Sequence, residues 1–137
     1  MAAQRAESVL SKRLRRADLT AVADVRATLR ERLRRRAWGE RELADIAELL
    51  TSELVTNALV HTGRDAEVTA TLERSGPSRL RVEVRDYVEH RPVQRNADGE
   101  ATGGRGLMLV QSLADAWGVR AVGAGKIVWF ELGGGPA

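Results

Sequence analysis

The sequence predicts an α/β (α+β) fold, a two-layer sandwich in which a mostly antiparallel sheet is covered by about three helices on one face. Three observations lead to this prediction. Apolar residues recur at helical spacing in the first half of the chain. The spacing then changes to alternation in two pairs of short segments, each pair joined by a glycine-containing turn. The resulting order is helix, helix, strand, strand, loop, helix, strand, strand, for which helices on one face of an antiparallel sheet is the simplest architecture.

Two helices are expected in the first half of the chain. Over residues 19–36, valines and leucines recur on one face and arginines on another. Gly39 follows this segment, as is typical of a helix end. A second helix is expected over about residues 40–62, where leucine, isoleucine and alanine side chains form an apolar stripe and Gly63 would end the helix. Each helix therefore has one face suited to packing on a sheet.

The first pair of strands is expected directly after the second helix. Residues 68–72 and 80–84 alternate apolar with polar side chains, and the sequence SGPS at 75–78 joins them into a hairpin. Residues 86–104 show little periodicity and contain one proline and several glycines. A loop of this length in a small domain is usually functional or disordered.

The last part of the chain is expected to hold a third helix and a second hairpin. The helix is predicted over residues 106–117, directly after a run of glycines, and the segments GVRAV and IVWFEL follow as strands joined by GAGK. Residues 1–17 are polar and weakly patterned, so both a tail and a short edge strand fit them. One domain is expected over residues 18–132, with a flexible tail at 133–137.

Composition excludes several classes of function. The 137 residues, 43% of them hydrophobic, are enough for one modest core. The absence of cysteine excludes disulfides, thiol chemistry and cysteine–zinc sites, and two histidines cannot build a multi-histidine metal site. No apolar run is long enough to span a membrane, and the N-terminus does not resemble a signal peptide. A cytoplasmic protein without membrane association is therefore expected.

Positive charge is concentrated in the first third of the chain. Residues 1–36 hold ten arginines, one lysine and four acidic residues, a net charge of +7, whereas residues 37–137 hold 11 basic and 15 acidic residues, a net charge of −4. The favoured interpretation is a solvated helix face, and the alternatives are a surface for nucleic acid or for an acidic protein partner. Nucleic acid is the least favoured, because aromatic residues do not interleave the basic ones.

The second predicted helix carries three polar residues four positions apart in the sequence SELVTNALVH. Asn57 and His61 fall within the apolar stripe of this helix, and Glu53 lies at its edge. Burying such groups without partners costs about 1–3 kcal/mol each. Either neighbouring groups satisfy them, or the helix lines a polar cavity that receives a ligand. An amide oxygen suits Mg²⁺ shared with phosphate, and a carboxylate one turn away could accept a proton from an attacking hydroxyl.

The sequence TGGRGLMLVQ at 102–111 provides possible phosphate donors. Its glycines allow backbone N–H groups to approach an anion closely, and the helix that follows presents its positive end. Neither the P-loop ending nor a dinucleotide-binding turn is present. Asp86, at the end of a predicted strand, either caps the next turn or accepts a hydrogen bond from the amino group of adenine.

These segments together resemble a known family. ELVTNALVH, VEVRD, GGRGLMLVQSLADAWGV and GKIVWFEL occur in this order between residues 53 and 132. They are similar to the ATP-binding module of the GHKL superfamily, which includes histidine kinases, type II topoisomerases and mismatch-repair ATPases. Within that superfamily the chain most resembles the bacterial anti-sigma factor serine kinases and their actinobacterial relatives.

The resemblance implies a Bergerat-type ATP-binding fold with ATP and Mg²⁺ as cofactors. It implies that Asn57 holds Mg²⁺, Glu53 is the general base, Asp86 recognises adenine, and residues 87–103 form the ATP lid. The remaining expected nucleotide-binding residues belong to the same helix or to the glycine-rich segment: His61, Gly103, Gly104, Arg105, Gly106 and Leu107.

The resemblance also implies a protein serine/threonine kinase that phosphorylates a small anti-sigma-factor antagonist, binds a sigma factor and forms a homodimer. Two departures point to a second hypothesis, a non-catalytic ATP-binding module that sequesters a protein partner. The superfamily's D-x-G-x-G motif is absent, because the residues that follow Asp86, beginning with Tyr87, do not include its glycines. Ile127 occupies a position where threonine is common, which is expected to remove a hydroxyl near the adenine pocket.

Overall fold

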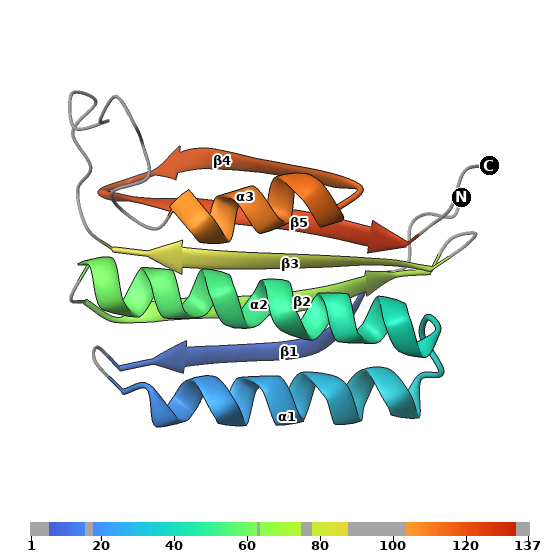
Figure 1. Cartoon of the computed structure of the whole chain (residues 1–137). Helices are drawn as coiled ribbons and strands as arrows, with labels where there is room; N and C mark the ends of the chain where they lie inside the picture. The colour runs from blue at the N-terminus through green and yellow to red at the C-terminus, as the bar shows by residue number, and fades with distance from the viewer. Residues whose placement is uncertain (1–5, 16–17, 63, 75–77, 88–103, 134–137) are drawn as a thin grey trace.

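The computed structural model describes residues 6–15, 18–62, 64–74, 78–87 and 104–133, with only the backbone described at 61–62 and 104–107. These residues form a five-stranded antiparallel sheet and three helices. The three helices lie side by side on one face of the sheet (Figure 1). The predicted two-layer α/β sandwich is therefore confirmed.

The order of strands in the sheet is β1-β2-β3-β5-β4, and every neighbouring pair is antiparallel. Of the two interpretations of the first 17 residues, the edge strand is the one found, because residues 6–14 pair with β2 through a register shift between Ser8 and Leu10. The strands are β1 (Ala6–Leu14), β2 (Ala66–Glu73), β3 (Arg79–Asp86), β4 (Ala116–Val122) and β5 (Gly125–Gly133).

The helices are α1 (Thr20–Arg35), α2 (Arg41–Thr62) and α3 (Gly104–Leu113). At the start of α1, the Asp18 carboxylate accepts hydrogen bonds from the Thr20 hydroxyl (2.5 Å) and from the Ala21 N–H (3.3 Å). The hydrogen bond from Thr20 holds the pKa of Asp18 below its ordinary value. After α1 the chain turns through Ala37 and Gly39, whose φ angles are +52° and +71°, before α2 begins.

The third helix differs from its predicted bounds at both ends. It begins two residues earlier, at Gly104, and ends at Leu113 instead of Trp117. The reason is long-range pairing: the Asp115 N–H donates to the carbonyl of Glu131 (2.9 Å), and Trp117 pairs with Phe130. Residues 116 and 117 therefore begin β4, and the apolar periodicity that suggested a longer helix belongs partly to a strand.

The core lies between the sheet and the helices. Alternate residues of β2 and β3 point into it and are almost fully buried, and α1 and α2 cover them with equally buried leucine, valine and alanine side chains. Trp117 and Val128 pack at the margin of this core. None of the described helices is long and apolar enough to cross a membrane.

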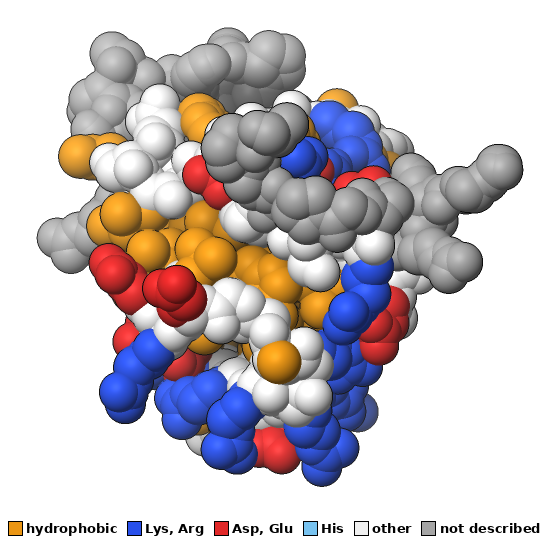
Figure 2. All heavy atoms as spheres, turned by 90° about the vertical axis from the view of Figure 1, so that its right-hand side faces the viewer, with side chains coloured by type: hydrophobic (Ala, Val, Ile, Leu, Met, Phe, Trp, Pro, Cys, Tyr) orange, Lys and Arg blue, Asp and Glu red, His pale blue; other side chains and the backbone are white. Residues whose placement is uncertain are grey.

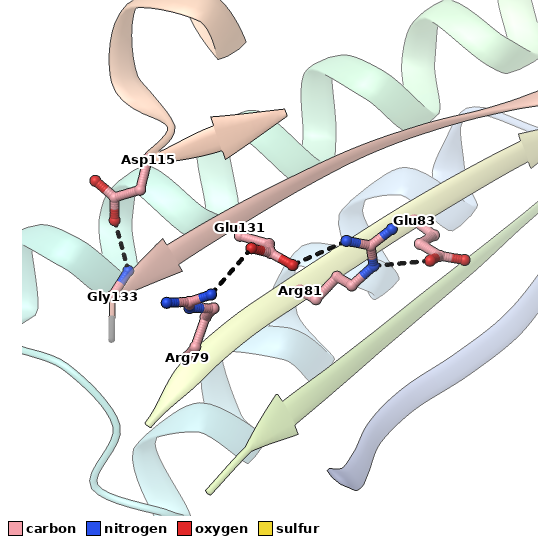
Figure 3. Close-up of polar contacts among 6 residues, drawn as sticks. All are labelled: Arg79, Arg81, Glu83, Asp115, Glu131 and Gly133. Carbon is pink, nitrogen blue, oxygen red and sulfur yellow. Dashed lines mark hydrogen bonds and ion pairs between the residues drawn. The ribbon is translucent and has the colours of Figure 1, made fainter. Parts of the chain in front are cut away.

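The other face of the sheet carries polar side chains, and none of the described helices covers it (Figure 1). Glu131 of β5 accepts hydrogen bonds from Arg79 (3.4 Å) and Arg81 (2.8 Å) of β3, and Arg81 also binds Glu83 (2.8 Å), as Figure 3 shows. The Arg81 guanidinium lies 4.1 Å from the centre of the Trp129 ring. Burial would lower the pKa of Arg81, but its hydrogen bonds to the two glutamates raise it overall, so the guanidinium stays charged.

The end of the molecule where α1 meets α2 has a groove of about 760 Å³. Its apolar floor includes Trp38, Leu43 and Ile46, and Figure 2 shows hydrophobic side chains gathered at the centre of this end with basic side chains along its lower rim. Trp38 is 5% exposed, and its indole N–H donates to the carbonyl of Ser78 (3.4 Å). Trp38 therefore packs locally at the turn between α1 and α2.

Candidate functional site

Three chain segments that carry predicted site residues meet at the end of the molecule opposite this groove. α2 finishes there at Thr62, β3 finishes there at Asp86, and α3 begins there at Gly104 (Figure 1). α2 contacts both β3 and α3. The fold thus brings together residues that lie about 50 positions apart in the sequence.

The orientation of α2 follows from its contacts with α1. Glu48 is 7% exposed and binds Arg26 (3.5 Å) and Arg30 of α1. Asn57 lies nine residues further along, which is about two and a half helical turns, so it lies on the opposite side of α2 from Glu48. That side faces α3, because α2 lies between α1 and α3 on the sheet (Figure 1).

Glu53 lies one turn before Asn57 on the same side of α2. Both residues are half-buried. No hydrogen bond or ion pair joins the Glu53 side chain to another residue in the described part of the chain. A half-buried carboxylate next to a half-buried amide is a donor set that suits a hydrated divalent cation or a hydroxyl group better than an apolar ligand.

Asp86 closes the floor of the site from the sheet. It follows the core residues of β3 in the same alternation, so its carboxylate faces the helix layer, and it is 3% exposed. The Lys126 N–H donates to its Oδ1 atom (3.3 Å). This hydrogen bond comes from the neighbouring strand β5, 40 residues away in the sequence, and it helps to fix the direction of the carboxylate.

Lys126 is a residue of this site that the sequence patterns did not single out. It pairs with Asp86 in the register of β3 and β5, so the two side chains lie on the same face of the sheet. Ile127 pairs with Arg85 and points to the other face. The expectation that Ile127 alters the adenine pocket is therefore wrong, because an alternating strand turns adjacent side chains to opposite faces.

The glycine-rich segment supplies a helix start at this site. Gly104 to Leu107 form the first turn of α3, where backbone N–H groups have no partner within the helix. The side chains of Arg105, Leu107 and His61 lie outside the described part of the structure, as do Gly103 and the predicted lid at 88–103. The glycines at 104 and 106 therefore remain predicted phosphate contacts, now placed at the start of a helix.

The number of ligating side chains near the site limits the kind of metal that the site suits. Among the described residues, no group of three or more histidine, cysteine, aspartate or glutamate side chains is arranged to hold a metal ion. A cation held here would depend on one or two protein oxygens and on oxygens of a ligand. This arrangement is the usual one for Mg²⁺ bound with phosphate.

Comparison with known proteins agrees with this geometry. The chain matches the family model of the histidine kinase-like ATPase domain over residues 15–132. The match begins in the segment that joins β1 to α1 and ends in β5, so it includes all three helices and the strands that carry the site. None of the curated proteins matches the chain. From the fold and from this match, we conclude that the chain belongs to the histidine kinase-like ATPase domain family.

Proposed function

We propose that the protein binds ATP with Mg²⁺ between α2, α3 and the end of β3, and that it uses this ATP as a regulatory kinase. The observation that carries the proposal is the placement of Asn57 on the side of α2 opposite Glu48, facing α3, while Asp86 is buried at the adjacent strand end. In this proposal the Asn57 amide oxygen binds Mg²⁺, and the Asp86 carboxylate accepts a hydrogen bond from adenine.

The first turn of α3 would hold the phosphates in this arrangement. Its backbone N–H groups and helix dipole favour negative charge, and Lys126 adds a cation on the same face of the sheet as Asp86. Mg²⁺ would neutralise charge that develops on the transferred phosphoryl group. Glu53 would accept the proton of the attacking hydroxyl, since phosphoryl transfer depends mainly on positioning and charge neutralisation.

ATP binding in the presence and absence of Mg²⁺ tests the first step. We expect Mg²⁺ to strengthen ATP binding by the wild type, and Asn57→Ala to remove most of that increase while leaving metal-free binding almost unchanged. Ser52→Ala is the matched control, because it also truncates a half-buried polar side chain of α2. Metal-dependent affinity retained in full by Asn57→Ala would refute the assignment of the Mg²⁺ ligand.

We propose further that the phosphoryl acceptor is a serine or threonine of a small anti-sigma-factor antagonist, and that the kinase binds a sigma factor as a homodimer. The support is the resemblance of the motifs on α2, β3 and α3 to those of the anti-sigma factor kinases. Phosphorylation of such an antagonist by wild type and by Glu53→Gln tests it. Equal rates would exclude Glu53 as the base.

A second candidate is a non-catalytic ATP-binding module that sequesters a protein partner. One observation favours it: the bulky Tyr87 follows Asp86 where the superfamily has glycine-containing sequence, and its ring is packed between arginines. Tight ATP binding without transfer to any serine- or threonine-containing antagonist would support this candidate over the kinase.

Nucleic-acid binding is the least favoured candidate, and the contacts of α1 neutralise part of its positive charge. The arginines of this basic helix already have partners within the protein. Arg26 and Arg30 bind Glu48, Arg34 and Arg35 bind Glu31, and Arg32 donates to the Val9 carbonyl. Titration with duplex DNA at two salt concentrations tests this, and a steep loss of affinity with salt would favour nucleic acid.

A further inference from the structure

Tyr87 lies next to Asp86 in sequence but on the opposite face of the sheet. Arg13, Glu67 and Arg85 form one row across β1, β2 and β3, because Glu67 pairs with Arg13 on one side and with Arg85 on the other. These side chains occupy the polar face of the sheet, away from the helices. Tyr87 follows Arg85 by two residues and so adds its ring to the end of this row.

The Tyr87 side chain is held by three residues of the row. The guanidinium carbon of Arg13 lies 4.9 Å from the centre of its ring, and that of Arg85 lies 4.7 Å from it. The Tyr87 hydroxyl donates to Glu67 Oε1 (2.9 Å), and this hydrogen bond raises the pKa of Tyr87. Both kinds of contact are favourable, and together they leave the ring little freedom.

Two of the residues that hold Tyr87 are themselves constrained. Arg13 also pairs with Asp65 (3.5 Å) at the start of β2. The Nε atom of Arg85 is buried without a hydrogen-bond partner among the described residues, and the guanidinium stacks on the Tyr87 ring. The row is therefore anchored on three strands.

The backbone at Asp86 and Tyr87 is packed against β5. A Cβ atom on Gly125 would lie 2.0 Å from the Asp86 carbonyl oxygen and 3.0 Å from Tyr87 Cα. The next residue, Lys126, donates its N–H to the Asp86 carboxylate. A rotation of this backbone would therefore shift the carboxylate and lengthen the hydrogen bond from Lys126.

We propose that Tyr87 is a positioning residue for Asp86: its ring, held by Arg13, Glu67 and Arg85, fixes the backbone from the polar face and so keeps the Asp86 carboxylate aimed at the base of the nucleotide. This proposal rests on the proposed function in that it takes Asp86 as the group that recognises adenine. It adds a determinant of base specificity that lies outside the nucleotide site.

The preference for ATP over GTP distinguishes a role of Tyr87 in positioning Asp86 from a role in stabilising the fold alone. Dissociation constants for Mg²⁺-ATP and Mg²⁺-GTP are measured for wild type, Tyr87→Phe and Tyr87→Leu. We expect Tyr87→Leu to lower the preference for ATP about tenfold, the effect of losing one well-aligned hydrogen bond to a charged group, with GTP affinity unchanged. Tyr87→Phe keeps the ring and should lose only part of the preference. An unchanged ATP-to-GTP ratio in Tyr87→Leu would overturn the proposal.

Arg81→Leu is the matched control. It removes the other arginine–aromatic stack of the same face, between Arg81 and Trp129, together with the ion pairs to Glu83 and Glu131. Because Arg81 lies five residues from Asp86 along β3, its loss should lower stability without changing base preference. A loss of preference in Arg81→Leu as large as in Tyr87→Leu would also overturn the proposal.

Hydrogen exchange of the Lys126 amide gives a readout that needs no nucleotide. We expect this amide to exchange faster in Tyr87→Leu than in wild type, while the amide of Val128 keeps its rate. If the wild type binds neither nucleotide, the proposed function fails, and the Lys126 amide still decides whether Tyr87 positions Asp86. Unchanged exchange at Lys126 would then refute the positioning role.

Discussion

The two faces of the sheet are stabilised in different ways. On the helix-covered face, β3 contributes Leu80, Val82 and Val84, which are at most 3% exposed. On the polar face, the same strand contributes Arg79, Arg81 and Glu83, which form ion pairs with partly exposed partners, and Arg81 also stacks on the Trp129 ring. Adjacent residues of one strand therefore occupy very different environments.

This difference indicates how much each face contributes to the free energy of unfolding. Burial of apolar surface scales with area and is not screened by salt, so the helix-covered face should account for most of the stability. Ion pairs at half-exposed positions contribute little each, and salt screens them. The polar face is better suited to fixing geometry, and at Tyr87 it does so directly behind the proposed nucleotide site.

The largest expected effect is at the core. Phe130 is fully buried on the helix-covered face, so Phe130→Ala should lower the free energy of unfolding by about 3–5 kcal/mol. Urea denaturation followed by circular dichroism measures it. A loss below about 1 kcal/mol would mean that the core is not packed as described.

A smaller loss is expected where β5 crosses the end of β3. Gly125→Ala places a methyl group 2.0 Å from the Asp86 carbonyl oxygen, so the strands must separate, at a cost of about 1–3 kcal/mol. Thermal unfolding measures the loss, and ATP affinity should fall with it because Asp86 moves. Ala124→Ser, at the exposed neighbouring position, is the control and should have little effect.

A buried polar group of α2, the Thr51 hydroxyl, lies in the apolar core, and its removal should raise stability. Thr51 is fully buried, and its hydroxyl has no hydrogen-bond partner among the described residues. Thr51→Val removes this unsatisfied group at almost constant volume, so we expect stabilisation of about 1 kcal/mol. Thr56→Val, at a half-buried position of the same helix, is the comparison. Destabilisation by Thr51→Val would show that the hydroxyl has a partner after all.

The smallest effect is expected on the polar face. Glu131→Gln weakens the ion pairs with Arg79 and Arg81, and because these groups are partly exposed the loss should be about 0.2–1 kcal/mol. The loss should shrink between low and high salt, whereas the loss for Phe130→Ala should not. Equal salt dependence of the two variants would contradict the contrast between the faces.

Local patterns predicted most of the fold. Alternation located β2 and β3 because each has one face in the core, and helical spacing located α1 and α2 for the same reason. The sequence does not decide the first strand, because Ser11, Lys12 and Arg13 interrupt its alternation and a register shift breaks it. The sequence predicts too long a third helix, because pairing with β5, which a local pattern does not reveal, converts residues 116–117 into strand.

The candidate site also has parts that local patterns predict and parts that depend on long-range pairing. Helical geometry places Glu53 and Asn57 on one side of α2. That this side faces α3 depends on the contacts of Glu48 with α1, which a local pattern does not reveal. The roles of Lys126 and Ile127 depend on the register between β3 and β5, which joins residues 40 positions apart. A single sequence does not fix that register, so it neither identifies Lys126 as a site residue nor shows that Ile127 points away from the site.

The two outermost described residues lie at the same end of the molecule. Ala6 pairs with Glu73 at the end of β2, and Gly133 pairs with Arg79 at the start of β3, whereas Asp86 lies at the other end of β3. A fluorophore, a solid support or a fused domain attached at either residue would therefore be tethered on the side away from the proposed nucleotide site. Immobilised or labelled forms of the protein should bind ATP with unaltered affinity, which makes both tethering points practical for single-molecule and biosensor measurements.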